Sequence, residues 1–405
     1  MHASCCGAPH VRASAFPVTL DSIEEDSVPE TVAPLTVVRA GILGTGGVAR
    51  LHAEALAALP GVELVAVSDS SLERAAAFAE QHGEDGRLAS VHATLEGMLA
   101  EAALDVVHLC TPPSGHADQT IAAVEAGCDV IAEKPPAFSL AELDRMTVAA
   151  GAAGRRLAVV FQQRTGSAVA HVKALLDEGA FGAPRVALCH TLWHRGDEYY
   201  AVPWRGTWAG EGGGTLLSHG IHQIDLLAHL LGDWSEASGA LWRLDRNLET
   251  EDLATGTVLF EHPLGAVVAS VVSTVLSPRE QSIIRLDCDL ATIELVHLYG
   301  HGHDHWRITP AAGVDEAVAA SWALPDDEVA SGHGVLLEAV YGARAAGLPM
   351  PDVAAEPARA LEIVTALYAS AGRGAPIAKS ALSDVALRGP LETMVRDRRR
   401  APQSS

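Results

Sequence analysis

The sequence predicts an α/β fold, in which an N-terminal Rossmann domain with a doubly wound parallel sheet precedes an α+β domain with a large open, mostly antiparallel sheet. Two observations predict this. Between residues 37 and 157, short apolar runs alternate with helical patterns, which is typical of parallel strands covered by helices on both faces. Beyond residue 158, the strand-like runs lengthen and follow one another at near-regular spacing, as in an antiparallel or mixed sheet.

In the first half, predicted strands and helices alternate. The predicted strands are 37–43, 62–67, 105–110, 129–132 and 158–161. The predicted helices are 49–59, 72–81, 116–126 and 140–150. Ser139 is the predicted N-cap of the last of these helices, because Glu142 follows three residues later and would complete a capping box.

The second half contains fewer helices and longer strands. Its predicted helices are 168–176, 216–231, 335–346 and 357–371. Its clearest predicted strands are 254–260, 266–276, 282–288 and 292–298, within a strand-rich section from 185 to 306. We therefore expect a disordered leader (1–36), an α/β domain with a doubly wound parallel sheet (37–157), a strand-rich α+β domain (158–378) and a C-terminal tail (379–405).

Composition argues against several classes of protein. The 405 residues are 48% apolar and carry a formal net charge of −23, which disfavours binding to nucleic acid phosphates. No apolar run approaches the roughly 20 residues that span a membrane, and the leader lacks the apolar core of a signal peptide. The six cysteines show neither a disulfide nor a zinc pattern. We expect a cytoplasmic enzyme with no nucleic acid or membrane partner.

A glycine-rich loop follows the first predicted strand and opens the first predicted helix, which is the context of a dinucleotide-binding loop. The loop comprises Gly44, Thr45, Gly46, Gly47, Val48 and Ala49. Gly44 permits the tight turn, Gly46 lets a pyrophosphate approach the backbone, and Ala49 lets the helix pack against the strand. The N-terminus of the helix offers free N–H groups to the phosphates.

The second predicted strand ends at Asp69, where a carboxylate would accept hydrogen bonds from the ribose of the cofactor. A carboxylate accepts from a 2′-hydroxyl but repels a 2′-phosphate, which prefers an arginine. Ser70 and Ser71 are neutral, although Arg74 lies one turn into the next helix. The sequence therefore favours NAD over NADP.

Two further strand ends carry candidate site residues. One predicted strand leads into Thr111-Pro112 and the next into Glu133-Lys134, and open α/β sheets bind ligands at the carboxyl ends of their strands. Only three of the 28 basic residues are lysines. Because an ammonium can pass a proton near neutral pH and a guanidinium cannot, we interpret Lys134 as a functional residue rather than a surface lysine.

These features together resemble the Gfo/Idh/MocA oxidoreductases, the family of glucose–fructose oxidoreductase and inositol dehydrogenase. The resemblance rests on Gly44-x-Gly46-x-x-Ala49, Thr111-Pro112, His116, Glu133-Lys134-Pro135 and the segment from Gly212 to Asp225 that contains Ser218 and His222. It extends from about residue 37 to residue 377. It implies that Thr111, Pro112, His116, Glu133 and Lys134 complete the cofactor site.

The resemblance also implies two catalytic residues. Lys134 would bind and polarise the reacting hydroxyl or carbonyl, and His222 would act as general acid and base while hydride moves to or from the nicotinamide. Pro135 would restrain Lys134, and the family suggests a cis bond between them. The substrate would be a sugar, sugar acid or cyclitol, and the assembly a homodimer or homotetramer.

Four residues are candidates for binding the substrate: Arg164, Trp204, Ser218 and Asp225. Ser218 departs from the family pattern, which often has an aspartate there, so myo-inositol itself is disfavoured. Arg164 could equally form a salt bridge at its strand end, and Trp204 could belong to the core. Asp225 could orient His222 or cap a neighbouring element. Aromatic and basic residues such as His194, Arg195, Tyr199, Tyr200 and Trp208 surround Trp204 in the sequence and suit a sugar.

We expect no metal site. His301, His303 and His305 alternate as zinc ligands on a strand would. However, Gly300 and Gly302 indicate a loop, and hydride transfer needs no metal.

The predicted function is therefore an NAD(P)-dependent dehydrogenase or reductase that acts on CH–OH groups. Two alternatives remain open. One is an NAD-dependent glycosidase, which removes a hydride transiently and returns it at the end. The other is a non-catalytic dinucleotide-sensing regulator, against which the presence of both Lys134 and His222 argues, because a sensor needs neither.

Overall fold

The computed structural model describes residues 37–83 and 87–395. The predicted leader (1–36) and the last part of the predicted tail (396–405) lie outside the described residues. Within the described part of the chain, no helix is both long and apolar enough to cross a membrane.

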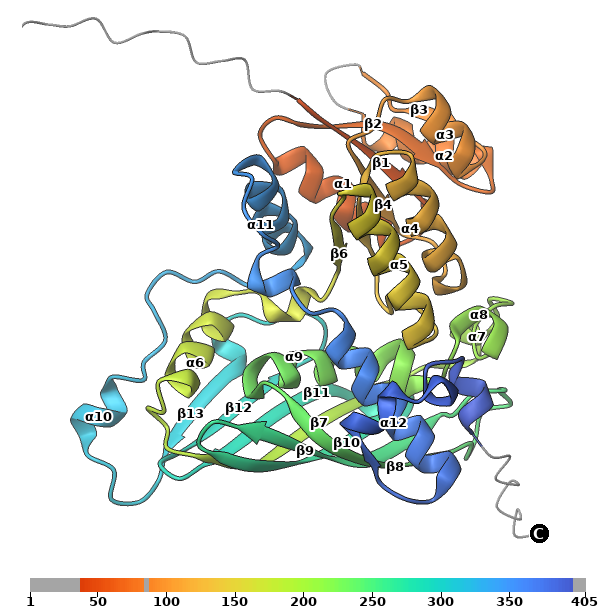
Figure 1. The fold of residues 1–405 in the computed structure, drawn as a ribbon. Coiled ribbons are helices and arrows are strands. Elements are labelled where there is room, and N and C mark those ends of the chain that lie inside the picture. Colours follow the sequence, from red (N-terminus) through yellow and green to blue (C-terminus); the bar gives the residue numbers. More distant parts are fainter. Residues whose placement is uncertain (1–36, 84–86, 396–405) are drawn as a thin grey trace, which may run out of the picture. The chain divides into compact units, whose positions relative to one another are not determined.

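Six parallel strands form the first sheet in the order β3-β2-β1-β4-β5-β6 (Figure 1). The elements are β1 (Val38–Leu43), α1 (Ala49–Ala58), β2 (Val62–Ser68), α2 (Leu72–Gln81), β3 (Ser90–His92), α3 (Leu95–Glu101), β4 (Val106–Leu109), α4 (His116–Glu125), β5 (Asp129–Ala132), α5 (Leu140–Ala153) and β6 (Leu157–Val159). The strand order reverses between β1 and β4, and doubly wound folds bind ligands at that point.

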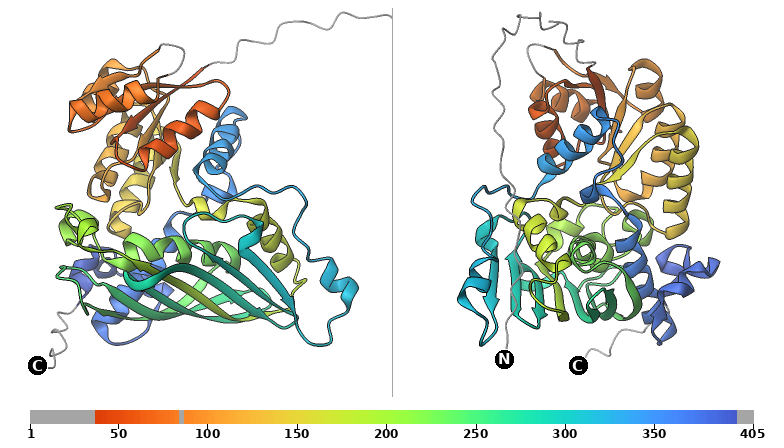
Figure 2. Two further views of the ribbon diagram at one scale, coloured as in Figure 1. Left: turned by 180° about the vertical axis from the view of Figure 1, so that it is seen from behind. Right: turned by 60° about the vertical axis from the view of Figure 1, so that its left-hand side comes forward.

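Helices cover both faces of this sheet (Figure 2). α1, α2 and α11 (His333–Ala345) share one buried apolar cluster with the sheet, and α3, α4 and α5 share another. Helix α11 comes from far along the chain, yet its Leu336, Leu337 and Tyr341 are buried against α1 and the sheet. The predicted doubly wound parallel sheet is confirmed.

Eight strands form the second sheet in the order β13-β12-β11-β7-β10-β9-β8-β14. All neighbouring pairs are antiparallel except β7 with β10, which confirms the predicted mostly antiparallel sheet. The strands are β7 (Pro184–His194), β8 (Trp234–Trp242), β9 (Leu253–His262), β10 (Gly265–Thr274), β11 (Leu276–Cys288), β12 (Ala291–His297), β13 (Trp306–Pro310) and β14 (Ile377–Ala378).

Helices α6, α9 and α12 pack on one face of the second sheet and bury the largest apolar cluster of the described chain. On its strands, Val186, Val268 and Val296 remain exposed. The helices of this half are α6 (Ser167–Asp177), α7 (Asp197–Tyr200), α8 (Trp208–Glu211), α9 (Ile221–Leu231), α10 (Glu316–Ala320), α11 and α12 (Ala358–Arg373).

The predicted helix 216–231 does not start as an α-helix. Its first turn, η3 (Leu216–Gly220), is a π-helical turn, and α9 follows directly. Isolated π turns are rare and occur frequently at functional sites. This turn contains Ser218, and it breaks the α-helical spacing that would place Ser218 and His222 on one face.

Other differences from the predicted elements are local. β3 and α3 are not among the predicted elements, and the predicted domain boundary after residue 157 falls inside β6. Ser139 caps α5 as predicted, but Glu142 accepts from the backbone N–H of Phe138 instead of that of Ser139. In the predicted tail, three 3₁₀ turns bury the side chains of Leu382, Leu387 and Leu391.

Candidate active site

One large cavity lies at the carboxyl ends of β1, β2, β4 and β5. Its volume is about 1080 Å3, above the roughly 300–1,000 Å3 of a pocket for a drug-sized ligand. Eleven of the predicted site residues line it: Gly44, Gly46, Gly47, Val48, Asp69, Thr111, Pro112, Glu133, Lys134, Trp204 and Ser218. A single cavity therefore joins most of the predicted cofactor residues to the predicted catalytic lysine.

The glycine loop has the geometry that a dinucleotide requires. Gly44 has a φ of +86°, and a Cβ there would lie 2.8 Å from the carbonyl oxygen of Cys110. A Cβ on Gly46 or Gly47 would meet no atom within 4 Å, so the cavity reaches the loop backbone. Val48 gives α1 no side-chain cap and its first turn holds no acidic residue, which leaves the positive end of the helix to a phosphate. These residues fit the pyrophosphate of a dinucleotide.

Alanine substitutions should separate the two uses of glycine in this loop. Gly44→Ala should lower both the melting temperature and NAD affinity, because a left-handed non-glycine residue costs about 1–3 kcal/mol and the Cβ overlaps the backbone of β4. Gly46→Ala should leave the melting temperature unchanged and weaken NAD binding at least about tenfold, which is about 1.4 kcal/mol. Differential scanning fluorimetry and NAD titration measure both. Unchanged NAD affinity in Gly46→Ala would contradict this placement of the pyrophosphate.

Asp69 is held rigidly at the end of β2. Its Oδ2 accepts from the backbone N–H and the hydroxyl of Thr45, both at 2.9 Å. Its Oδ1 accepts from the N–H of Ser71 at 2.9 Å and from Arg74 at 2.5 Å. Burial acts to raise the pKa of Asp69, but these hydrogen bonds lower it to about 2. The carboxylate is therefore ionised at every physiological pH and faces the cavity beside the largely exposed Arg74.

Lys134 follows β5 and reaches into the cavity. Its Nζ donates to the carbonyl oxygen of Ser218 at 3.1 Å, which links the first sheet to the π turn. The bond from Lys134 to Pro135 is cis, as the family resemblance suggests. Burial lowers the pKa of Lys134, the carboxylate of Glu133 opposes this, and Arg205 adds to the lowering.

His116 lies outside the cavity wall. It is fully buried, and its Nδ1 and Nε2 lie 2.9 Å and 3.1 Å from the carbonyl oxygens of Pro135 and Thr111. The imidazole therefore bridges the two turns that carry Thr111-Pro112 and Lys134-Pro135. Direct contact with a cofactor, which the sequence predicts for His116, does not fit this position, because the ring is enclosed by the backbone it bridges.

Two histidines near Lys134 differ in their surroundings. His222, the predicted acid/base residue, does not line the cavity, and its Nδ1 is buried without a hydrogen-bond partner. Burial and then the charge of Lys134 hold the pKa of His222 well below its usual value, so the imidazole is neutral. His219 does line the cavity, where its Nδ1 lies 2.7 Å from Ser218 Oγ and its Nε2 3.3 Å from Tyr199 Oη.

The sequence offered no signal for a role of His219, because only the π turn brings its side chain to the cavity wall. Nor did it single out the other residues that line this end of the cavity: Trp193, Arg205 and Glu211. Arg205 lies 3.8 Å from the ring centroid of Tyr199 and 4.4 Å from that of Trp204, and its guanidinium donates to Tyr199 Oη. Arg195 lines the cavity too and pairs with Glu280 at 2.8 Å. Of the predicted aromatic and basic residues, Arg195, Tyr199 and Trp204 line the cavity, whereas His194, Tyr200 and Trp208 do not.

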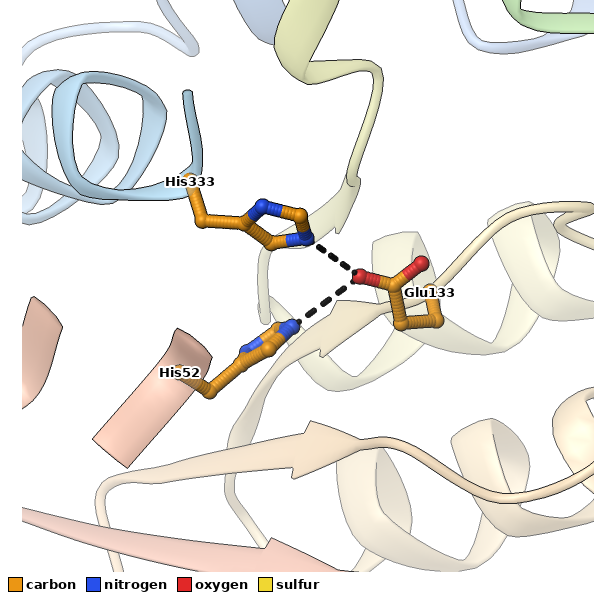
Figure 3. Close-up of side chains that lie close together, drawn as sticks. All are labelled: His52, Glu133 and His333. Atoms are coloured by element: carbon orange, nitrogen blue, oxygen red, sulfur yellow. Dashed lines mark hydrogen bonds and ion pairs between the residues drawn. The ribbon is translucent and has the colours of Figure 1, made fainter. Parts of the chain in front are cut away.

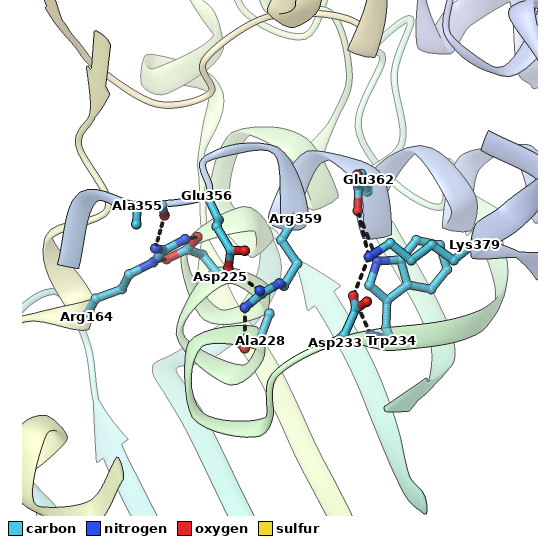
Figure 4. Close-up of polar contacts among 10 residues, drawn as sticks. All are labelled: Arg164, Asp225, Ala228, Asp233, Trp234, Ala355, Glu356, Arg359, Glu362 and Lys379. Carbon is cyan, nitrogen blue, oxygen red and sulfur yellow. Dashed lines mark hydrogen bonds and ion pairs between the residues drawn. The ribbon is translucent and has the colours of Figure 1, made fainter. Parts of the chain in front are cut away.

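Arg164 and Asp225 do not reach the cavity. They form a buried two-bond ion pair of 2.6 Å and 2.5 Å, and Arg164 also donates to the carbonyl oxygen of Ala355 at 2.6 Å (Figure 4). Both side chains are at most 6% exposed. The geometry therefore supports the salt-bridge interpretation of Arg164, and both carboxylate oxygens of Asp225 accept from Arg164 rather than from His222.

The alternating histidines make no common site. His301 bonds to the carbonyl oxygen of Gln163, His303 to Ser167, and His305 to the N–H of Gly302. In the described part of the chain, one other set has ligand-type atoms within 4.8 Å of one another: His52, Glu133 and His333 (Figure 3). These atoms lie close together because both imidazoles hydrogen-bond to Oε1 of Glu133, and these two bonds explain the arrangement without a metal ion.

Comparison with known proteins decides the family. Residues 38–161 match the family model described as "Oxidoreductase family, NAD-binding Rossmann fold", and residues 169–294 match the "GFO/IDH/MocA C-terminal domain". The two matches cover the first sheet, most of the second sheet and more than half of the chain. The chain belongs to the Gfo/Idh/MocA family.

Several Gfo/Idh/MocA relatives are similar over much of their length. D-glucoside 3-dehydrogenase of Escherichia coli (strain K12) is 31% identical over 286 residues, which cover 65% of this chain and 78% of that protein. Inositol 2-dehydrogenase 3 of Saccharopolyspora erythraea is 33% identical over 202 residues, 48% of this chain and 54% of that protein. The WlbA dehydrogenase of Bordetella pertussis, solved with NADH and UDP-GlcNAcA, is 26% identical with a TM-score of 0.74, and the match covers 84% of this chain and 97% of that one.

Membership in the Gfo/Idh/MocA family establishes the class of activity. The chain is an NAD(P)-dependent oxidoreductase with an NAD-binding Rossmann domain.

Proposed function

We propose that this enzyme transfers hydride between NAD and a hydroxyl- or carbonyl-bearing carbon of a sugar, sugar acid or cyclitol. The observation that carries the proposal is the single cavity, which runs from the glycine loop and Asp69 past Lys134 to Tyr199 and Trp204. Aromatic faces beside arginines suit the apolar face and the hydroxyls of a sugar. The names of the relatives, which include a glucoside dehydrogenase and an inositol dehydrogenase, support this substrate class.

The proposed mechanism assigns roles to the two predicted catalytic residues. Nicotinamide, when bound, supplies a hydride acceptor or donor at its C4. The ammonium of Lys134 would bind the reacting oxygen and stabilise its developing negative charge. The neutral imidazole of His222 lies behind the cavity wall, and its Nδ1 has no partner among the described residues. Through one bridging water it would accept the proton that an alcohol loses on oxidation. In the reverse direction the imidazolium would return it.

The proposal also includes the sequence-based assignments of domains, substrate contacts, location and assembly. We propose 37–157 as the cofactor-binding domain, 158–378 as the substrate domain, Ser218 and Trp204 as substrate contacts, and a cytoplasmic homodimer or homotetramer.

A panel assay tests the proposed function. The purified chain is mixed with NAD and with methyl β-D-glucoside, glucose, glucuronate, myo-inositol and scyllo-inositol in turn, and NADH is followed at 340 nm alongside product. Formation of NADH in a one-to-one ratio with an oxidised product is the expected result. Cleavage of the glucoside without net NADH would instead indicate the glycosidase. Tight NAD binding with no turnover of any compound would indicate the sensor.

The preference for NAD should depend on Asp69. Asp69→Ala should weaken NAD binding about tenfold or more, because a hydrogen bond to a charged group contributes about 1.5–3 kcal/mol. It should also improve NADP binding relative to NAD, because Arg74 loses its partner carboxylate and becomes available to a 2′-phosphate. Since the pKa of Asp69 is about 2, this carboxylate should not make the affinity of the wild type for NAD change between about pH 5 and pH 8. Fluorescence titration with both cofactors measures this, and an unchanged ratio of affinities in the variant would contradict it.

A further inference from the structure

A hydrogen-bonded chain of buried side chains ends at Glu133. Tyr341 Oη lies 2.8 Å from His108 Nε2, and His108 Nδ1 lies 2.7 Å from His52 Nδ1. His52 Nε2 then lies 3.1 Å from Glu133 Oε1, and His333 Nε2 lies 3.0 Å from the same oxygen (Figure 3). These hydrogen bonds join α1, β4, the end of β5 and α11, and the proposed mechanism uses none of the four side chains that lead to Glu133.

If both rings are neutral, the hydrogen-bonded chain has one direction of donation. An ionised Glu133 can only accept, so His52 must carry its proton on Nε2. The Nδ1 of a neutral His52 then accepts from His108 Nδ1–H, which leaves His108 Nε2 to accept from the hydroxyl of Tyr341. Every bond is made with neutral rings and one carboxylate. Burial and then the neighbouring His52 hold the pKa of His108 well below its usual value, in keeping with a neutral ring.

Glu133 is a buried anion next to the catalytic lysine. Its other oxygen, Oε2, accepts from the backbone N–H of Lys134 at 3.2 Å. Burial acts to raise the pKa of Glu133, but the hydrogen bonds from His333 and His52 hold it well below its usual value. The charged groups that act on Lys134 are Glu133 and Glu211, which favour the ammonium, and Arg205 and Arg195, which disfavour it. The neutral rings of His219 and His222 also lie close enough to feel the charge of Lys134.

We propose that His52, His108, Tyr341 and His333 are positioning residues that hold Glu133 as a carboxylate, and that this buried charge keeps Lys134 an ammonium. Of the carboxylates near Lys134, Glu133 is the one with two imidazole donors and a backbone N–H, so its charge is the better fixed. Glu211, by contrast, has its pKa raised by burial. The importance of this charge for catalysis rests on the proposed function, in which the ammonium of Lys134 stabilises negative charge on the reacting oxygen.

The three lysines of this chain make the inference directly measurable without a substrate. In the full-length protein labelled with 13C and 15N on lysine, Lys134, Lys173 and Lys379 give three side-chain signals whose titration is followed by NMR. Glu133→Gln keeps the shape and removes the charge. We expect the titration midpoint of Lys134 to fall by at least about one pH unit, a tenfold loss of proton affinity, as for the loss of an opposite charge within a few ångströms. Lys173 and Lys379 should not move.

Variants of His333 test the role of the hydrogen-bonding partners. Its side chain is 10% exposed, so both variants should fold. His333→Leu removes a donor to Glu133 and should lower the midpoint of Lys134 by a smaller amount. His333→Gln retains an N–H donor and should restore it. Tyr368→Phe is the matched control, because it removes the donor to a different buried carboxylate, Glu251, and should leave Lys134 unchanged.

The outcomes separate this inference from the proposed function. An unchanged midpoint of Lys134 in Glu133→Gln, or, if that variant does not fold, equal midpoints in His333→Leu and the wild type, would overturn the inference. The expected shifts in a protein that forms no NADH from any polyol would support the hydrogen-bonded chain and refute the proposed function. An unchanged midpoint of Lys134 in a protein that does form NADH from a polyol would support the proposed function and refute the role of the hydrogen-bonded chain.

Discussion

Lys134→Met should lower turnover at least about 10³-fold while NAD binding changes less than threefold. Methionine has a similar length and no charge, so the variant loses the group that binds the reacting oxygen and stabilises its charge, an effect of about 10²–10³ or more for one preorganised donor. The substitution leaves the glycine loop and Asp69, which line the other end of the cavity, unchanged, so NAD should still bind. Steady-state rates at 340 nm and NAD titration of the same sample measure both quantities.

Lys173→Met is the matched control for that variant. Lys173 lies on α6 and pairs with Asp177 one helical turn away, outside the cavity. It should retain full turnover. If Lys134→Met turned over at the rate of Lys173→Met, the proposed role of Lys134 would be wrong, and its interaction with Ser218 would have to be structural.

Asp225→Ala should destabilise the fold by about 3–5 kcal/mol, the usual cost of removing one partner from a buried ion pair. The variant leaves the guanidinium of Arg164 buried without its carboxylate. That guanidinium also holds the carbonyl of Ala355 before α12, so two segments lose their common anchor (Figure 4). Urea denaturation measures the loss.

Two comparisons show whether that loss belongs to the ion pair. Asp177→Ala removes an exposed partner of a helical pair and should cost at most about 0.5 kcal/mol. The double variant Arg164→Leu/Asp225→Leu should be more stable than Asp225→Ala, because it leaves no unpaired charge. A folded Asp225→Ala protein with normal stability but a raised KM for substrate would instead restore the sequence-based view of Asp225 as a substrate contact.

The parts of the fold nearest the cofactor were the most predictable. Each parallel strand except β3 is a short apolar run bounded by glycine, proline or a polar residue, and each covering helix except α3 shows a clear period. β3 has only three residues, two of them exposed, so no run of apolar residues marks it. Because all six strands are parallel, their carboxyl ends meet at one edge of the sheet. This explains why Gly44, Asp69, Thr111 and Lys134, spread over 90 residues of sequence, border one cavity.

The substrate side of the site was less predictable because its contacts join distant elements. Arg164 and Asp225 lie 61 positions apart, and no spacing in the sequence reveals that each takes the other as its partner. His219 was overlooked because the family resemblance assigns the acid/base role to His222, which a regular α-helix would place on the same face as Ser218. The π turn at 216–220 changes that register and brings His219 to the cavity wall.

A crystal structure with bound NAD and a polyol that the enzyme oxidises would show whether cofactor and substrate share this cavity beside Lys134. We expect the pyrophosphate to lie at the backbone of Gly46 and Gly47 and a ribose to lie on Asp69. We also expect Lys134 Nζ within about 3.2 Å of the substrate oxygen on the carbon nearest nicotinamide C4. A dinucleotide bound outside this cavity, or a substrate whose reacting oxygen is remote from Lys134, would contradict it.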